Sequence, residues 1–149
     1  MTMQALQWRD STLRIIDQTL LPNEVNYIEL PALADVWEAI KVLRVRGAPL
    51  IGICAAFGVL VGLREKKTRD VPGVVAAVQE SAAYLATSRP TAVNLFWALD
   101  RMKRVAETGA PSMAHAELLA RLEAEAQAIY AEEIASCRAI GEFGAPLIP

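Results

Sequence analysis

The sequence predicts an α+β fold, in which a small antiparallel β-sheet packs on a mainly helical bundle. Residues 1–30 alternate apolar and polar side chains, which is the period of β-strands. In residues 31–141, apolar side chains recur every three or four positions, which is the period of α-helices. The chain has 149 residues, of which 54% are hydrophobic and 21% charged, so it can form one domain with a buried core.

The β-rich start contains a predicted hairpin and a third strand. Apolar residues alternate on either side of a polar turn at residues 10–12, and these are Leu6, Trp8, Leu13 and Ile15. Residues 25–30 follow a second turn and predict the third strand. Three such strands form an antiparallel sheet with one face on the helices.

Five helices are predicted after the strands, each from a start signal in the sequence. The signals are Asp35 with Glu38 as a capping box, Pro49, Pro72, Thr91 as a cap, and Ser112. The last helix is the longest and reaches about Gly141. Residues 142–149 predict the start of a linker or strand, and residues 144–149 are apolar, so we expect the chain to be the N-terminal region of a longer protein.

The longest apolar run, residues 50–63, predicts a buried core helix rather than a membrane span. As a helix it covers roughly 21 Å, whereas the hydrocarbon core of a bilayer is about 30 Å thick. Pro49 and Arg64 bracket the run. No membrane partner is therefore expected.

Charge and composition exclude several classes of function. Lys and Arg total 15 against 17 Asp and Glu, a net charge of -2, whereas nucleic-acid binders usually carry a basic excess. Two cysteines and one histidine are too few for a disulfide framework or for a zinc site built from Cys and His alone. Cys54 and Cys137 lie on apolar helix faces and predict packing roles. His115, near a helix start, predicts a solvated or cap-neighbouring side chain.

Two arginines stand just before predicted helix starts. Arg46 precedes Gly47, Ala48 and the apolar helix, and Arg89 precedes the helix expected from Thr91. A helix N-terminus offers free N–H groups and the positive end of the helix dipole, and a guanidinium suits phosphate or carboxylate. The spacing alone leaves two interpretations open: a phosphate site, or ordinary turns in which Arg46 pairs with a carboxylate.

Three motifs in order resemble those of methylthioribose-1-phosphate isomerases. Residues 45–49 read Val-Arg-Gly-Ala-Pro, residues 89–95 read Arg-Pro-Thr-Ala-Val-Asn-Leu, and residues 17–22 read Asp-Gln-Thr-Leu-Leu-Pro. The superfamily also contains ribose-1,5-bisphosphate isomerase and the regulatory subunits of translation initiation factor 2B. The match spans nearly the whole chain.

The resemblance implies an aldose–ketose isomerisation of 5-methylthioribose 1-phosphate to 5-methylthioribulose 1-phosphate in methionine salvage. It implies that Arg46, Gly47, Ala48 and Arg89 bind the substrate, that no metal or organic cofactor takes part, and that the protein is a cytoplasmic homodimer or homo-oligomer. The family's catalytic cysteine and aspartate, and its Rossmann-like C-terminal domain, are expected beyond Pro149, so this chain alone is expected to be inactive. The alternatives are ribose-1,5-bisphosphate isomerase and a non-catalytic sensing or interaction module like the translation-factor subunits.

Overall fold

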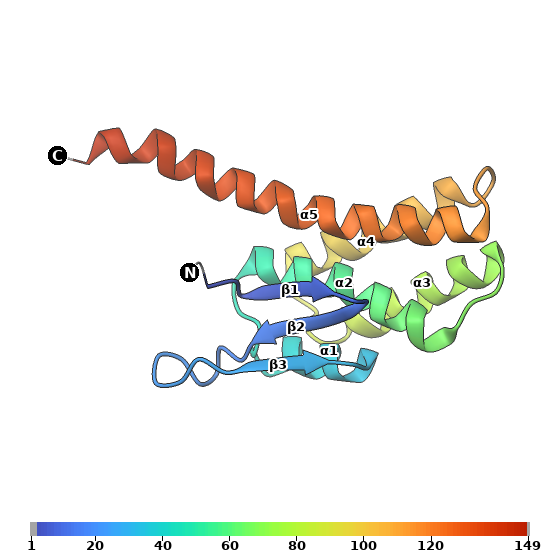
Figure 1. The fold of residues 1–149 in the computed structure, drawn as a ribbon, viewed down its shortest axis with the longest axis horizontal. Helices are drawn as coiled ribbons and strands as arrows, with labels where there is room; N and C mark the ends of the chain where they lie inside the picture. Colours follow the sequence, from blue (N-terminus) through green and yellow to red (C-terminus); the bar gives the residue numbers. More distant parts are fainter. Residues whose placement is uncertain (1–2, 149) are drawn as a thin grey trace.

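The computed structural model describes residues 3–148 and has the α+β architecture predicted from the sequence (Figure 1). Its three strands form an antiparallel sheet in the order β1-β2-β3, and five α-helices and a short 3-10 helix follow. The strands are β1 Leu6–Arg9, β2 Thr12–Ile16 and β3 Tyr27–Leu30. The helices are α1 Leu33–Lys41, α2 Ala48–Lys66, α3 Val71–Ala86, α4 Val93–Gly109, α5 His115–Gly144 and the 3-10 helix η1 Ala145–Leu147.

The predicted hairpin is confirmed by the pairing of β1 with β2. Leu6 lies opposite Ile15, and both side chains are completely buried. Asp10 and Ser11 form the turn with positive φ angles of 48° and 59°, the backbone of a tight two-residue hairpin. The third strand begins at Tyr27 rather than at residue 25. Its ladder with β2 starts where Tyr27 lies opposite Ile16, the last residue of β2, and ends where Leu30 lies opposite Leu13.

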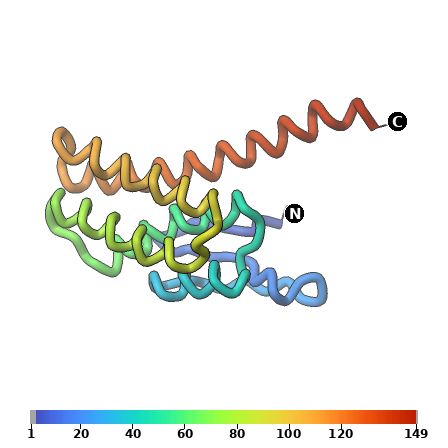
Figure 2. Tube along the Cα trace, turned by 180° about the vertical axis from the view of Figure 1, so that it is seen from behind, coloured from blue at the N-terminus to red at the C-terminus, as the bar shows by residue number. Residues whose placement is uncertain are grey.

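Helix α2 is the centre of the molecule, as the apolar run predicts. It packs against the other four α-helices and contacts β2, and every residue from 51 to 63 is buried (Figures 1 and 2). Among the described residues it is the one helix long and apolar enough to cross a membrane, and 72% of its most apolar window is buried inside the protein. The expectation of a core helix is therefore confirmed.

Two predicted caps are wrong by one to three residues. Helix α1 begins at Leu33 with Ala32 at the cap position, and Asp35 instead lies in the first turn, where its carboxylate accepts the N–H of Ala32 at 3.0 Å. Helix α4 is preceded by Ala92 rather than Thr91, because the Ala92 carbonyl accepts the first helical N–H, that of Leu95, at 3.0 Å.

The last helix also differs from its prediction at both ends. It begins at His115 rather than Ser112, because the N–H groups of Ser112 and Met113 both donate to the Gly109 carbonyl and form a turn. It continues to Gly144, and η1 follows where a strand or linker was expected. In Figures 1 and 2 the second half of α5 extends away from the rest of the molecule.

The close packing of α2 predicts the effect of enlarging Gly58. A Cβ atom at this position would lie 2.7 Å from Val36 Cγ1 and 2.9 Å from Leu85 Cδ1. Gly58→Leu should therefore lower the free energy of unfolding by about 1–3 kcal/mol through overpacking. Urea unfolding followed by circular dichroism measures this. Gly141→Leu is the matched control, since nothing lies within 4 Å of a Cβ there, and an equal loss in both variants would contradict the prediction.

Candidate anion site at the starts of α2 and α4

A buried carboxylate organises the turn that follows β2. The Asp17 side chain is 4% exposed, and its Oδ1 atom accepts the Thr19 N–H at 3.0 Å and the Thr19 hydroxyl at 2.6 Å. Its Oδ2 atom accepts a hydrogen bond from the Arg44 guanidinium. Burial alone would raise the pKa of Asp17, but the hydrogen bonds from Thr19 and Arg44 together outweigh it and hold the pKa below its usual value.

Arg44 ties this turn to the segment that leads into α2. Its guanidinium also donates to both carboxylate oxygens of Glu38, at 2.9 and 3.0 Å, and its carbonyl accepts the Gln18 N–H at 2.9 Å. The sequence patterns predicted no role for Arg44 and placed Asp17 only at the start of a family motif. They predicted Glu38 in a capping box with Asp35, whereas its carboxylate accepts these two hydrogen bonds from Arg44. The available signal was the Asp-x-Thr pattern, which is typical of a turn in which the aspartate accepts a backbone N–H two residues on.

Arg46 and Gly47 form the entry into α2. The exposed Arg46 side chain donates to the Gln18 carbonyl at 3.0 Å, so the motif at residues 17–22 lies against the motif at residues 45–49. Gly47 occupies the cap position with φ of 97°, which a residue with a Cβ rarely adopts, and the space around it is open. Helix geometry leaves the N–H groups of Gly47, Ala48 and Leu50 without acceptors inside the helix.

The start of α4 lies against the second turn of α2. A Cβ atom at Gly52 would lie only 2.7 Å from the carbonyl oxygen of Asn94, in the first turn of α4. At their other ends both helices meet α5: Gly109 of α4 contacts Leu118, and Leu63 of α2 shares a cavity with Leu119. The two helices therefore run parallel, with their amino ends at the same end of the molecule (Figure 2).

These two helix starts differ from the other three in having no carboxylate. Asp35 in α1, Asp70 before α3 and Glu117 in α5 each accept a backbone N–H at their helix start, at 3.0, 2.7 and 2.8 Å. Helices α2 and α4 have neither a side-chain cap nor an acidic residue in the first turn. Two positive helix ends thus lie side by side without a negative group from these helices, and Arg46 and Arg89 precede them.

The structure therefore brings together the segments that carry the predicted site residues Arg46, Gly47, Ala48 and Arg89. Arg89 lies three residues before the cap of α4, half-buried, and its carbonyl accepts the Ala92 N–H at 3.0 Å. That the two guanidinium groups face one ligand stays a prediction.

Comparison with known proteins places the chain among relatives that share this arrangement. Residues 44–149, which include both helix starts, match the initiation factor 2 subunit family. The chain belongs to this family. Its first 30 residues add the sheet to that matched segment.

The curated relatives of this family member are named as sugar-phosphate isomerases. It is 48% identical over 145 residues to 5-deoxyribose 1-phosphate isomerase of Moorella thermoacetica, covering 96% of this chain and 40% of that protein. It is 45% identical over 148 residues to methylthioribose-1-phosphate isomerase of Symbiobacterium thermophilum, covering 97% and 40%. The chain thus spans about 40% of the length of the curated relatives it matches.

Two solved structures have the same fold over nearly the whole chain. The 5-methylthioribose 1-phosphate isomerase of Pyrococcus horikoshii superposes with a TM-score of 0.93 at 31% identity, covering 99% of this chain and 41% of its own. The delta subunit of translation initiation factor 2B from A. fulgidus superposes with a TM-score of 0.87 at 33% identity, covering 99% and 42%. Both the catalytic and the translation-factor branches thus share this domain.

The cysteines and the histidine lie apart from the helix starts. Cys54 is completely buried in α2, as predicted, and burial raises the pKa of its thiol to about 12. The packing role predicted for Cys137 is wrong: it is exposed beyond the core, and its thiol donates to Glu133 at 3.2 Å, which raises its pKa. His115 is the first residue of α5, which confirms its predicted position near a helix start. Its Nε2 atom lies 3.1 Å from the Thr68 hydroxyl.

The network around Asp17 predicts a specific dependence of stability on pH. The pKa of Asp17 is lower in the folded chain than in the unfolded chain, so its ionised form stabilises the fold fully above about pH 4, and this contribution is lost as the pH falls through the folded pKa. Asp17→Asn should therefore lower the free energy of unfolding by about 1–3 kcal/mol at pH 7. Urea unfolding at pH 7 and pH 3 should show the difference from wild type shrinking in acid.

Asp100→Asn is the control for this prediction. Asp100 is exposed and, among residues 3–148, pairs only with Lys103 on its own helix, so its loss should change the free energy of unfolding by less than about 1 kcal/mol. The assignment fails if Asp17→Asn is no less stable than Asp100→Asn at pH 7.

Proposed function

We propose that residues 1–149 form the phosphate-binding part of an isomerase that converts 5-methylthioribose 1-phosphate into 5-methylthioribulose 1-phosphate, in methionine salvage. The observation that carries the proposal is the pair of parallel helix starts without carboxylate caps, each preceded by a motif arginine. The names of the curated relatives and of the Pyrococcus structure support the substrate class.

The substrate phosphate supplies the negative charge that the two helix starts lack. The N–H groups of Gly47 and Ala48 donate to its oxygens, and the guanidinium groups of Arg46 and Arg89 neutralise its charge. Arg46 uses one Nη2 hydrogen for the Gln18 carbonyl and keeps its other donors for the ligand. An anion at this position also offsets the repulsion between the two parallel helix dipoles.

The chemistry itself requires groups other than these. Opening the sugar ring and moving hydrogen between C1 and C2 needs an acid and a base close to those atoms. Arginine does not act as a base near neutral pH, and Cys54 is buried with a pKa of about 12. We propose that the acid and the base lie outside residues 1–149, in the part that corresponds to the remaining length of the relatives, and that no metal or organic cofactor takes part.

A second substrate, 5-deoxyribose 1-phosphate, is favoured by the 48% identical relative. The two sugars differ only in the group on C5, whereas the proposed site holds the phosphate on C1, so both fit it. Ribose 1,5-bisphosphate differs by a second phosphate on C5. A non-catalytic sensing module is favoured by the translation-factor structure, since it has the same fold. A cytoplasmic location and a homodimer or homo-oligomer complete the proposal.

The proposal is tested with a chimera in which residues 1–149 replace the matching part of the Symbiobacterium enzyme. We expect ketose formation from methylthioribose 1-phosphate by the chimera and none by residues 1–149 alone. In the chimera, Arg46→Ala and Arg89→Ala should each lower kcat/KM about 10- to 100-fold, because each removes a charge-assisted hydrogen bond to phosphate.

Arg104→Ala is the matched control, because Arg104 is an exposed arginine on α4 itself, and it should change kcat/KM by less than about twofold. A folded chimera that binds the sugar phosphate without turnover would favour the sensing module. Turnover by residues 1–149 alone would place the acid and the base within this chain. Assays with 5-deoxyribose 1-phosphate and ribose 1,5-bisphosphate decide between the substrates.

A further inference from the structure

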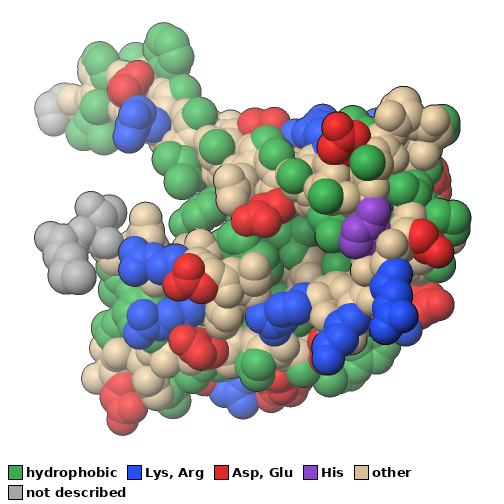
Figure 3. All heavy atoms as spheres, turned by 45° about the vertical axis from the view of Figure 1, so that its right-hand side comes forward, with side chains coloured by type: hydrophobic (Ala, Val, Ile, Leu, Met, Phe, Trp, Pro, Cys, Tyr) green, Lys and Arg blue, Asp and Glu red, His purple; other side chains and the backbone are tan. Residues whose placement is uncertain are grey.

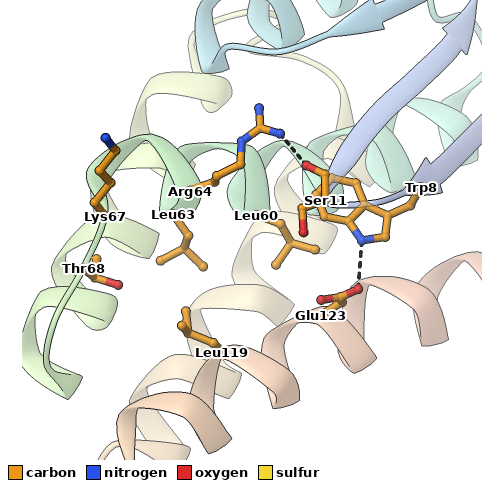
Figure 4. Close-up of a pocket in the computed structure, with 9 residues that line it drawn as sticks. All are labelled: Trp8, Ser11, Leu60, Leu63, Arg64, Lys67, Thr68, Leu119 and Glu123. Carbon is orange, nitrogen blue, oxygen red and sulfur yellow. Dashed lines mark hydrogen bonds between the residues drawn. The ribbon is translucent and has the colours of Figure 1, made fainter.

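A cavity of about 310 Å³ opens at the carboxyl end of α2, away from the helix starts described above. It lies between the β1–β2 turn, the last turns of α2 and the first half of α5 (Figure 4). Its volume is in the range of small-molecule sites. Helix α2 has 19 residues and is about 28 Å long, so this cavity and the proposed phosphate site are far apart.

The floor of the cavity is apolar and rigid. Leu60, Leu63 and Leu119 point toward one another in its middle, and Leu60 and Leu63 are almost completely buried (Figure 4). Trp8 forms one wall: its ring stacks on Phe57 with centroids 5.3 Å apart, and its Nε1 donates to Glu123 at 2.9 Å. The tryptophan is therefore fixed by contacts on two sides and offers a preformed surface.

The rim of the cavity carries positive charge. Arg64 is held in place by hydrogen bonds to the carbonyls of Ser11 and Pro31, which use two of its five donors without neutralising its charge. Lys67 lies at the other end of the cavity, and its side chain points away from the hydroxyl of Thr68 and from the leucines (Figure 4). On the face shown in Figure 3, apolar side chains line a hollow beneath the long helix and basic ones follow its lower edge.

Lys67 stands out from its neighbours in two ways. Lys66 forms an ion pair with Glu80, whereas none of the ion pairs formed by residues 3–148 includes Lys67. Lys67 also caps α2 with φ of 48°, a left-handed conformation in which glycine or asparagine is usual. A charged side chain therefore lies on the rim of an apolar cavity, at a backbone position that is unfavourable for any residue with a Cβ.

We propose that this cavity binds a small amphipathic anion: a carboxylate or phosphate ester that carries an apolar ring or short chain. The apolar body packs on the leucines and the Trp8 ring, and the anionic group lies on the basic edge formed by Arg64 and Lys67, since the Thr68 hydroxyl already lies 3.1 Å from Nε2 of His115. Glu123 is engaged by the Trp8 indole at the opposite end and so favours placing the anion near Lys67. This site is independent of the proposed isomerase function.

The test uses residues 1–149 and two fluorescent probes of the same apolar body. One is 8-anilinonaphthalene-1-sulfonate, an anion, and the other is N-phenyl-1-naphthylamine, which lacks the sulfonate. We expect saturable binding of the sulfonate at one site and clearly weaker binding of the neutral probe. Lys67→Gln should raise the Kd of the sulfonate about 3- to 10-fold and change the Kd of the neutral probe by less than about twofold. Lys66→Gln is the matched control and should change neither.

Leu119→Trp should abolish binding of both probes, because the indole fills the cavity. Circular dichroism and thermal melting verify that Leu119→Trp folds. If Leu119→Trp does not fold, Lys67→Glu still tests the role of the charge, because Lys67 is exposed and its replacement leaves the core intact. Sulfonate binding that both variants leave unchanged overturns the proposal. Equal binding of the two probes shows a site for neutral apolar molecules and also overturns it. A concentration-dependent dimer that Leu119→Trp disrupts would also overturn the proposal, since the cavity would then lie in an interface between two copies of the chain.

Discussion

The burial of α2 on all sides is the constraint on which the rest of the structure depends. A helix surrounded by four others needs short side chains where its neighbours approach, and three glycines supply them. Gly52 lies against the start of α4, Gly58 against Val36 of α1 and Leu85 of α3, and Gly62 against Ser81 of α3. Each glycine therefore fixes the position of a particular neighbour, and the apolar run of α2 stabilises the whole arrangement through burial.

The contact at Gly52 has an electrostatic consequence. It holds α4 parallel to α2, so two positive helix ends are brought together, which is unfavourable unless an anion lies between or beside them. Carboxylates stabilise the starts of α1, α3 and α5 from within the chain, whereas α2 begins with Gly47, Ala48 and Pro49, and α4 begins at Val93 after Ala92, with no acidic residue in either first turn. Packing and the proposed function are thus linked: the geometry required by the core brings together the two helix starts at which we propose that a phosphate binds.

Sequence reasoning predicted the features that depend on neighbouring residues. The hairpin, the core helix and the helical starts at Pro49 and Pro72 follow from local periodicity and from the fixed φ of proline. Apart from the helix starts predicted at Asp35, Thr91 and Ser112, which local signals placed one to three residues away, the missed features depend on contacts distant in sequence. Asp17 and Arg44 are 27 residues apart, and neither their ion pair nor the parallel contact of α2 with α4 has a local signal. Cys137 was misassigned because the apolar stripe of α5 continues past the point where the core ends.

The two ends of α2 use charge in opposite ways. At the amino end the helix dipole itself favours an anion, and we propose that backbone N–H groups and two arginines bind it there. At the carboxyl end the dipole is negative, and an anion is held only if side chains reverse the local potential. Arg64, Lys66 and Lys67 supply that charge. Lys66 is paired with Glu80, whereas Arg64 donates to two neutral carbonyls and so keeps its charge, and together with Lys67 it makes the rim of the cavity positive. One buried helix separates the proposed phosphate site from the proposed cavity site, and their different sources of charge let each be altered without the other.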